Sequence, residues 1–524
     1  MKVACIQVPA NDWKDAPTAW LFLKELIHAA AKEHDLVIVP ESAYPAYFLS
    51  RHEAADVAPV SLILDQVSDI ARASGSYIAF GYADGFANAA TLFARDGMEI
   101  ARKEKSYLWH FDHRWFTPGE EVMIADTEFG RVALVVCADA RLTELVRVVA
   151  LEGAKLIIDL ANLTASGPYA GGLTNAQCEF LLGTRARENG VWLAVADKWG
   201  VEADTVTYAG RSAVYAPDGS CAAQAPSDQT MTVSVDIALD SAGHINTDTG
   251  APLPQRRPEL YSLLTADTQD IPIYRILSEA VTPEFTTPYI TVSSLNQAPY
   301  AREDQLRHLQ RLVEHEPHLI VLPTYSGTIV DLADYQQQLE TEQLLLMSDM
   351  YEGIIRSRLV SKEQVIGTYV TMHSASKEDS GLSADSVFPH VMNCSFGLVG
   401  VIHGSEALIP EATRCLMLAG ADLVVWQHGM PYRDALPLAR TRAAENRMYV
   451  AAAFSSDLSE RNEEGASFIV DPNGNVIAST LLGRPIHATG VYCTLAAARS
   501  KSIVPGTHVV FDRKPKNYRR LTSI

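Results

Sequence analysis

Short uninterrupted hydrophobic runs recur along the first half of the chain, each bounded by charged residues, glycine or proline. Runs of this kind predict β-strands buried on both faces, here at residues 4–8, 36–39, 77–81, 132–136, 156–160 and 191–196. Between them, hydrophobic residues recur with the spacing of amphipathic helices, at residues 20–34, 55–74, 142–152 and 173–189. Alternating strands and helices predict an α/β fold built from layered sheets.

The same pattern occurs twice along the chain. TRAREN at residues 184–189 recurs as TRAAEN, and RRPELY at residues 256–261 recurs as RKPKNY, both after about 257 residues. GRVALVVCADARLTE, which starts at Gly130, aligns without a gap to GLVGVIHGSEALIPE, which starts at Gly397. A period this long is that of a domain and not of a solenoid repeat. The predicted organisation is a first domain at residues 1–267, a proline-containing linker at 268–287 and a second domain at 288–524.

The composition of the chain mainly excludes certain kinds of binding partner, metal site and cellular location. A chain of 524 residues exceeds what one hydrophobic core usually serves. Its net charge of −20 argues against binding to nucleic acids or anionic membranes. Seven cysteines are scattered without a CxxC pair, which favours a reduced protein with neither a zinc site nor a disulfide framework. We find no signal-peptide core and no hydrophobic run long enough to span a membrane, and we expect a cytoplasmic protein.

Three chemically capable residues follow predicted strands. Glu41 comes directly after LVIVP, Lys105 lies in KEKSYLW, and Cys137 ends the run VALVVC. Each has a simpler explanation when taken alone, as a solvated carboxylate, a surface lysine or a cysteine that only fills the core. In α/β sheets, however, functional side chains gather where strands end and loops begin. The three positions are therefore candidate site residues.

Together these segments resemble the nitrilase, or carbon–nitrogen hydrolase, superfamily. VIVPESAYP resembles the family's strand-Pro-Glu element, KEKSYLW followed by WFTPG its lysine element, and CADARLTE its cysteine element. The resemblance extends over about residues 1–265. It implies two tandem αββα sandwich domains packed as an intrachain pseudo-dimer. It also implies a catalytic triad of Glu41, Lys105 and Cys137, with no metal and no organic cofactor.

A triad of this composition suits the cleavage of amides. An ordinary thiol is mostly protonated at neutral pH, so Glu41 would take the proton of Cys137. Lys105 and the backbone N–H of Ala138 would stabilise the oxyanion that forms on attack. Glu41 would then protonate the leaving amine and activate the water that releases the acid. We therefore predict a thiol amidohydrolase acting on a small carboxamide or an N-carbamoyl compound.

Several neighbouring residues are candidates for support or substrate binding. The family's second glutamate has no match in FDHRWFTPG, where Asp112 or His113 would replace it. Asp139 and Arg141 follow the cysteine and are explained either by an ion pair that holds the loop or by contact with the substrate. Further candidates lie on loops that could form the walls of the pocket: Tyr47 and Trp115.

The second copy lacks the predicted triad. The gapless register puts Gly404 at the position of the nucleophile, and PTYSG puts Thr324 at the position of the base. When Gly367 is taken as the counterpart of Gly81, the segment up to the nucleophile's position is shorter by about 19 residues, and the lysine has no counterpart. The TRAAEN and RKPKNY segments persist. We therefore predict a degenerate, non-catalytic second domain that serves the first as a built-in dimer partner, with further homo-oligomerisation left open.

Other functions stay open beside the amidohydrolase. Within the superfamily, the same thioester chemistry would serve a nitrilase, or an acyl transferase if an amine replaced water as the acceptor. A non-catalytic scaffold or binding protein is the alternative of a different class, because half of the chain has lost the site. In each enzymatic alternative the expected partner is a small molecule, with no nucleic acid and no membrane.

Overall fold

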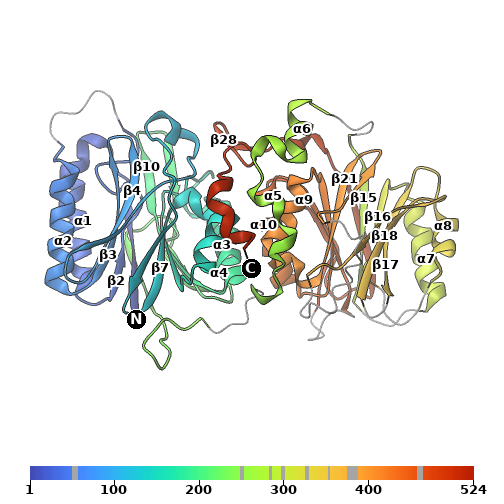
Figure 1. The fold of residues 1–524 in the computed structure, drawn as a ribbon, viewed down its shortest axis with the longest axis horizontal. Helices are drawn as coiled ribbons and strands as arrows, with labels where there is room; N and C mark the ends of the chain where they lie inside the picture. Colours follow the sequence, from blue (N-terminus) through green and yellow to red (C-terminus); the bar gives the residue numbers. More distant parts are fainter. Residues whose placement is uncertain are drawn as a thin grey trace. The chain divides into compact units, whose positions relative to one another are not determined.

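The computed structural model describes residues 1–49, 57–247, 253–281, 286–296, 301–324, 330–351, 354–373, 388–456 and 464–523. The chain forms two compact units, one of Met1–Ala251 with Val504–Thr507 and one of Pro252–Ile503 with His508–Ile524. In each unit two sheets lie face to face, and helices cover their outer faces (Figure 1). The predicted α/β class and the tandem αββα architecture are therefore confirmed.

The first unit contains a large and a small sheet. The large sheet has the order β11-β10-β1-β2-β3-β4-β5 with β14 paired to β1, and the small sheet has the order β13-β12-β9-β8-β7-β6. Strands β1 to β3 are mutually parallel, as are β7 to β9. The strands are β1 (Lys2–Pro9), β2 (Leu36–Ile38), β3 (Tyr77–Asp84), β4 (Ala87–Phe93), β5 (Glu99–Glu104), β6 (Met123–Thr127), β7 (Gly130–Val136), β8 (Leu156–Leu160), β9 (Trp192–Ala196), β10 (Lys198–Glu202), β11 (Val206–Ala209), β12 (Ala213–Tyr215), β13 (Cys221–Gln224) and β14 (Met231–Asp236).

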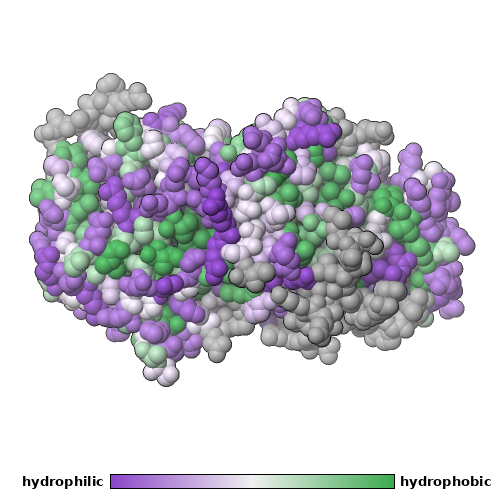
Figure 2. Space-filling view, viewed as in Figure 1, coloured by the Kyte–Doolittle hydropathy of each residue, from purple (hydrophilic) through white to green (hydrophobic). Residues whose placement is uncertain are grey.

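Four helices cover the outer faces of these two sheets (Figure 1). They are α1 (Ala16–Ala31), α2 (Val60–Ser74), α3 (Thr143–Leu151) and α4 (Leu182–Asn189). The predicted helix at 55–74 begins only at Val60, because Pro59 disfavours helical geometry in the residue before it; residues 55–56 lie outside the described residues. The face shown in Figure 2 is largely hydrophilic with hydrophobic side chains between. Two hydrophobic residues of α1, Leu21 and Phe22, are exposed.

The second unit repeats this arrangement. Its sheets have the orders β19-β18-β17-β16-β15-β26 and β20-β21-β22-β23-β24-β25. The strands are β15 (Tyr289–Leu295), β16 (Leu319–Val321), β17 (Leu344–Tyr351), β18 (Ile354–Val360), β19 (Val365–Val370), β20 (Val391–Cys394), β21 (Gly397–His403), β22 (Leu423–His428), β23 (Tyr449–Phe454), β24 (Phe468–Val470), β25 (Val476–Ser479) and β26 (Ile486–Tyr492); the main helices are α7 (Arg302–Val313), α8 (Leu332–Gln338), α9 (Pro410–Leu418) and α10 (Tyr432–Asn446). Consequently β15 to β19 correspond to β1 to β5, and β20 to β23 correspond to β6 to β9.

This correspondence corrects one detail of the predicted alignment. Gly81 lies on β3, whereas Gly367 lies on β19, the counterpart of β5. Pairing the two glycines was therefore wrong, because it compared a central strand with an edge strand. Both glycines lie within runs of strand-forming residues. The sequence of such a run does not show whether the strand is central or at the edge of the sheet. The lysine position must therefore be located from the end of β19.

The segment predicted as a linker, residues 268–287, contains a short helix. Helix α6 (Pro272–Ser278) begins with proline, whose missing N–H is harmless in the first turn of a helix. Ile273 of this helix is buried, and α6 packs against α9. The prolines of this segment thus mark a helix start as well as breaks in the chain. The domain boundaries themselves stay a prediction.

Candidate active site

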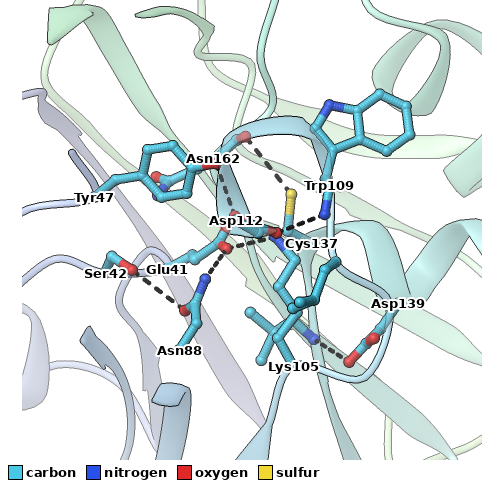
Figure 3. A network of polar contacts seen from close by, with 12 residues as sticks. Glu41, Ser42, Tyr47, Asn88, Lys105, Trp109, Asp112, Cys137, Asp139 and Asn162 are labelled. Atoms are coloured by element: carbon cyan, nitrogen blue, oxygen red, sulfur yellow. Dashed lines mark hydrogen bonds and ion pairs between the residues drawn. The ribbon is translucent and has the colours of Figure 1, made fainter. Parts of the chain in front are cut away.

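Glu41, Lys105 and Cys137 converge in the first unit (Figure 3). Each comes shortly after a strand, Glu41 after β2, Lys105 after β5 and Cys137 after β7. The Nζ atom of Lys105 lies 2.7 Å from Oε1 of Glu41. The thiol of Cys137 interacts electrostatically with both charged groups. The three residues are at most 4% exposed, so any chemistry here takes place largely shielded from bulk water.

Asp112 supplies a second carboxylate to the lysine. Its Oδ2 atom lies 2.8 Å from Nζ of Lys105 and accepts the backbone N–H of Trp109 at 2.7 Å. Its Oδ1 atom accepts the hydroxyl of Tyr47 at 2.7 Å. The side chain of His113, by contrast, is exposed. Of the two residues considered as replacements for the family's second glutamate, Asp112 is the one that contacts Lys105.

Two buried carboxylates thus share one ammonium. Burial raises the pKa of Glu41, the attraction of Lys105 opposes this, and the charge of Asp112 raises that pKa further. Burial alone would lower the pKa of Lys105, but Asp112 and then Glu41 outweigh it and hold that pKa well above its usual value. Lys105 is therefore a permanent cation, while Glu41 takes up a proton more readily than an exposed glutamate does. A general base and acid needs this property.

The two oxygens of Glu41 have different surroundings. Oε1 accepts a hydrogen bond from the ammonium of Lys105 and a second one, at 2.6 Å, from the side-chain amide of Asn88. The hydroxyl of Ser42 donates to the amide oxygen of Asn88 at 3.2 Å, which orients that amide. Among the described residues, the buried Oε2 atom has no hydrogen-bond partner. One oxygen is thus held in place, and the other is left to accept a proton.

Cys137 occupies a strained turn at the end of β7. Its φ of 51° is left-handed, an uncommon conformation for a residue other than glycine. Its N–H donates to Asp159 at 2.8 Å, and its carbonyl accepts the side-chain amide of Gln177 at 3.1 Å. The thiol donates to the carbonyl of Asn162 at 3.6 Å. Partners on both sides of the residue therefore hold the thiol in one place.

The thiol is protonated at rest. Burial, followed by the charge of Glu41, raises the pKa of Cys137 well above its usual value, and the opposing effect of Lys105 does not cancel this. A buried thiol of this kind is a poor nucleophile until a base removes its proton. Activation of this thiol would therefore need a proton acceptor, and Glu41 is a carboxylate whose charge acts on it.

Asp139 joins the loop after β5 to the loop after β7. Its Oδ1 atom accepts the backbone N–H groups of Ser106 and Tyr107 at 2.9 and 2.8 Å. Its Oδ2 atom accepts the N–H of Val136 at 3.3 Å and lies 3.5 Å from Nζ of Lys103. Asp139 is fully buried. These contacts tie the strand end that carries Lys105 to the strand end that carries Cys137.

The remaining predicted residues lie around this centre. Ala138 is buried in the turn that begins at Cys137. The Arg141 guanidinium lies over the ring of Trp109, 4.7 Å from its centroid, a cation–π contact. Trp115 is half-buried and meets the ring of Tyr47 edge-on, with 5.8 Å between centroids. All the predicted residues except the exposed His113 are thus at least partly buried.

Sequence reasoning missed several supporting residues: Asn88, Asp159, Asn162, Gln177 and Glu202. Asp159 had a usable signal, because a charged residue inside the hydrophobic run LIIDL must have a partner when buried. Glu202 ends β10, and its Oε1 atom accepts the backbone N–H groups of Tyr47 and Phe48 at 2.7 and 2.6 Å. It thereby holds the loop that presents Tyr47 to the site. Neither its position nor its spacing in the sequence indicated this contact.

The second unit places other residues at the same three strand ends. Thr324 follows β16 as Glu41 follows β2, and Thr371 follows β19 as Lys105 follows β5. Gly404 begins the turn after β21 with a φ of 44°, the left-handed conformation that Cys137 adopts in the first unit. The counterparts of Glu41, Lys105 and Cys137 are therefore Thr324, Thr371 and Gly404.

A neutral hydrogen-bonded network occupies the corresponding place. The imidazole of His403 contacts Ser357 through Nε2 and Thr371 through Nδ1, both at 2.7 Å. Burial lowers the pKa of His403 to about 4, so this ring is uncharged at neutral pH. The hydroxyl of Ser357 also contacts Gln427. Such a network satisfies buried polar groups and provides no charged base.

In the described ranges, no group of three or more histidine, cysteine, aspartate or glutamate side chains is arranged to hold a metal ion. The described helices likewise include none that is long and apolar enough to cross a membrane.

Comparison with known proteins identifies the family. The carbon–nitrogen hydrolase family matches residues 2–246 and 307–482. The human omega-amidase is 27% identical over 285 residues, 50% of this chain and 97% of that protein. A nitrilase of Pyrococcus abyssi is 29% identical over 250 residues, 45% of this chain and 90% of that protein. Among solved structures, an amidase from Nesterenkonia sp. shares 24% identity over 48% of this chain and 94% of that chain, with a TM-score of 0.41. The family match falls in both repeats and covers well over half of the residues, so the chain belongs to the carbon–nitrogen hydrolase family as a tandem member.

Proposed function

We propose that the first unit hydrolyses the C–N bond of a small carboxamide or N-carbamoyl compound through a thioester on Cys137. The observation that carries this proposal is the Lys105 ammonium held between the carboxylates of Glu41 and Asp112, next to a buried thiol. Relatives named omega-amidase, from human and from Arabidopsis thaliana, support the choice of an amide over a nitrile.

The first step is attack of the thiol on the carbonyl carbon. Oε2 of Glu41 accepts the thiol proton while Sγ of Cys137 forms its bond to carbon and the C=O electron pair moves to oxygen. The ammonium of Lys105 and the N–H of Ala138 stabilise the resulting oxyanion; one such donor contributes about 10²- to 10³-fold in rate. Because Lys105 stays charged throughout, it stabilises the transition state without a proton transfer of its own.

The second step expels the amine. The C=O bond forms again, the C–N bond breaks, and the proton held by Glu41 passes to nitrogen, so that ammonia or an amine leaves. A raised pKa suits Glu41 to both halves of this exchange, since it must bind the proton and then release it. The acyl group remains on Cys137 as a thioester.

The third step regenerates the enzyme. Water gives a proton to Glu41 and attacks the thioester carbon, after which Sγ leaves and takes the proton back. The product is a carboxylic acid, or a carbamic acid in the case of an N-carbamoyl substrate. Throughout the cycle Asp112 balances the charge of Lys105, and the hydroxyl of Tyr47 holds Asp112 in position.

A substrate screen tests the proposal. The purified full-length chain is incubated with primary carboxamides, N-carbamoyl amino acids and the matching nitriles, and ammonia and acid are quantified. We expect ammonia and acid in equal amounts from at least one amide or carbamoyl compound, and slower release from the matching nitrile. Turnover of nitriles alone, or release of an acyl group only to added amines, would replace the proposal by the nitrilase or the acyl transferase alternative.

Substitution of the nucleophile tests the role of the triad. Cys137→Ala should abolish turnover and the hydroxamate that hydroxylamine forms from a thioester, while thermal unfolding stays close to that of the wild type. Cys178→Ala serves as the control, because Cys178 is a buried cysteine of the same unit whose thiol donates to the carbonyl of Asn175. Undiminished turnover in Cys137→Ala would refute the thioester route.

A further inference from the structure

A turn near the end of the chain is part of the first unit. Strands β27 (Ser502–Val504) and β28 (Thr507–His508) form a two-stranded sheet, and Val504–Thr507 group with the first unit. Gly506 in this turn has a φ of +84°, and a Cβ atom there would lie 3.1 Å from the ring of His113. The turn therefore lies against the loop that runs from Lys105 through Asp112 to His113.

Thr507 bonds to this loop on both sides of Trp109. Its hydroxyl donates to the carbonyl of Leu108 at 3.0 Å and accepts the N–H of His110 at 3.2 Å. The Thr507 side chain is 1% exposed, so water does not compete for these bonds. A single hydroxyl thus connects a residue near the end of the sequence to the backbone of the lysine loop.

The bonded segment sets the position of Asp112. Trp109 N–H donates to Oδ2 of Asp112 at 2.7 Å, and the N–H of Asp112 donates to the carbonyl of Trp109 at 2.9 Å. His110, between them, has a left-handed φ of 46°. This conformation is uncommon for a residue other than glycine and carries an energetic cost, so contacts that hold it matter. The bond from His110 N–H to Thr507 is one such constraint.

We propose that Thr507 is a positioning residue for the active site. By holding Leu108 and His110, it keeps Asp112 where its carboxylate meets both Lys105 and the hydroxyl of Tyr47. The catalytic consequence rests on the function proposed above, whereas the effect on the loop can be measured without any substrate. The role gives Val504–Thr507, which belong to the first unit, a share in that unit's chemistry.

Two substitutions at this position separate the hydroxyl from the shape of the side chain. Thr507→Val keeps the shape and removes both hydrogen bonds, and it should lower kcat/KM about tenfold, the order expected for a misplaced catalytic group supported by two buried hydrogen bonds. Thr507→Ser keeps the hydroxyl and should stay within about twofold of the wild type. If Thr507→Val does not fold, Thr507→Ala takes its place.

Thr480→Val is the matched control. Thr480 is 4% exposed, lies in the second unit, and its hydroxyl accepts the N–H of Ser467 at 3.0 Å. The same chemical change at this site should leave kcat/KM within about twofold of the wild type. An equal loss of activity in Thr480→Val and Thr507→Val would indicate general destabilisation and overturn the proposal.

Hydrogen exchange measured by mass spectrometry tests the effect on the loop. Amides in residues 106–116 should exchange faster in Thr507→Val than in the wild type, in Thr507→Ser or in Thr480→Val. The acid limb of the pH profile of kcat/KM should also shift in Thr507→Val. We expect a shift to lower pH, the direction that loss of the Asp112 charge produces. A purely structural defect would not cause such a shift.

The outcomes distinguish this inference from the proposed function. If the wild type hydrolyses no amide, the proposed function fails, and the exchange data still decide whether Thr507 holds the loop. If the wild type is active and Thr507→Val changes neither exchange nor kcat/KM, the positioning role is refuted. Faster exchange with unchanged kcat/KM would also refute it, because the loop would then move without consequence for the site.

Discussion

Lys105 carries one positive charge between two buried carboxylates, so the group as a whole has an excess of negative charge. Burial raises the pKa of Glu41, the attraction of Lys105 opposes this, and the charge of Asp112 adds to the increase. Each neighbour of Glu41 shifts its pKa in a known direction: Asp112 raises it, and the hydrogen bond from Asn88 lowers it. Two substitutions should therefore move the same pH profile in opposite directions.

Asp112→Asn should move the acid limb of kcat/KM to lower pH. The sign follows because Glu41 must be ionised to act as the base, and removing the negative charge of Asp112 removes a cause that raises the pKa of Glu41. The catalytic rate should also fall, since Lys105 loses a partner. The pH dependence of kcat/KM measures the shift. Asp126→Asn is the control, because Asp126 lies on β6, is exposed and pairs with Arg131.

Asn88→Ala should move the acid limb to higher pH. This substitution removes a hydrogen bond that stabilises the ionised form of Glu41, so that carboxyl should hold its proton to a higher pH. The two profiles are compared with that of the wild type in the same buffers. A shift in the same direction for both variants would show that the limb reports a group other than Glu41.

At the scale of elements, both units place a carboxylate in the turn after the first of three parallel strands. The strand is β7 in the first unit and β21 in the second. Asp139 accepts the N–H groups of Ser106 and Tyr107, and Glu406 accepts those of Met372 and His373, both at 3.1 Å. In each unit the carboxylate also accepts the N–H of the last strand residue before the turn. In the second unit the turn begins with Gly404 and not with a cysteine, so what both units share is the use of this carboxylate to join two strand ends.

Asp139→Ala should therefore mainly lower stability. It leaves three backbone N–H groups without this acceptor and the buried ammonium of Lys103 without this carboxylate, and breaking a buried ion pair costs about 3–5 kcal/mol. Denaturant unfolding followed by circular dichroism measures the loss. Asp126→Ala, which breaks an exposed ion pair, should cost less than about 1 kcal/mol.

The same variant distinguishes the two explanations considered for Asp139. A large loss of stability with a modest change in KM supports the structural one. An unchanged unfolding midpoint with a large increase in KM would instead indicate contact with the substrate.

At the scale of the whole molecule, two copies of one fold carry different residues at the same three strand ends. The scaffold persists in both: Arg185 and Arg442 bond to the carbonyls of Ala140 and Ala407 in the turns that follow β7 and β21. Arg442 also pairs with Glu445, as Arg185 pairs with Glu188. The fold therefore does not depend on Glu41, Lys105 and Cys137, and the second unit retains the surrounding frame with Thr324, Thr371 and Gly404 at the corresponding strand ends.

The double variant Cys137→Ala, Gly404→Cys should remain inactive. A thiol at position 404 would have Thr324 and Thr371 at the strand ends where Glu41 and Lys105 stand in the first unit, and thus neither base nor cation. Amide turnover should equal that of Cys137→Ala alone. The substitution should also cost about 1–2 kcal/mol, because Gly404 has a left-handed φ of 44°. Restored turnover would show that the second unit retains a working base.

The sequence alone determined the layered α/β class, the tandem repeat and the candidate positions at three strand ends. These features follow from local patterns, because hydrophobic periodicity defines strands and helices and the residue after a buried strand lies at the edge of the sheet. The same reasoning found Gly404 and Thr324 in the second copy. It mistook the counterpart of Gly81, because a β-type run does not state its place in a sheet.

Only the tertiary structure decided which side chains meet. That Asp112 and not His113 contacts Lys105 depends on the loop conformation around His110, and two of that loop's hydrogen bonds come from Thr507, almost 400 residues away. Asn88 and Asp159 reach the site from neighbouring strands, whose register no local pattern specifies. The directions of the pKa shifts likewise depend on burial and on charges brought together by folding, which are properties of the packed molecule and of no single segment.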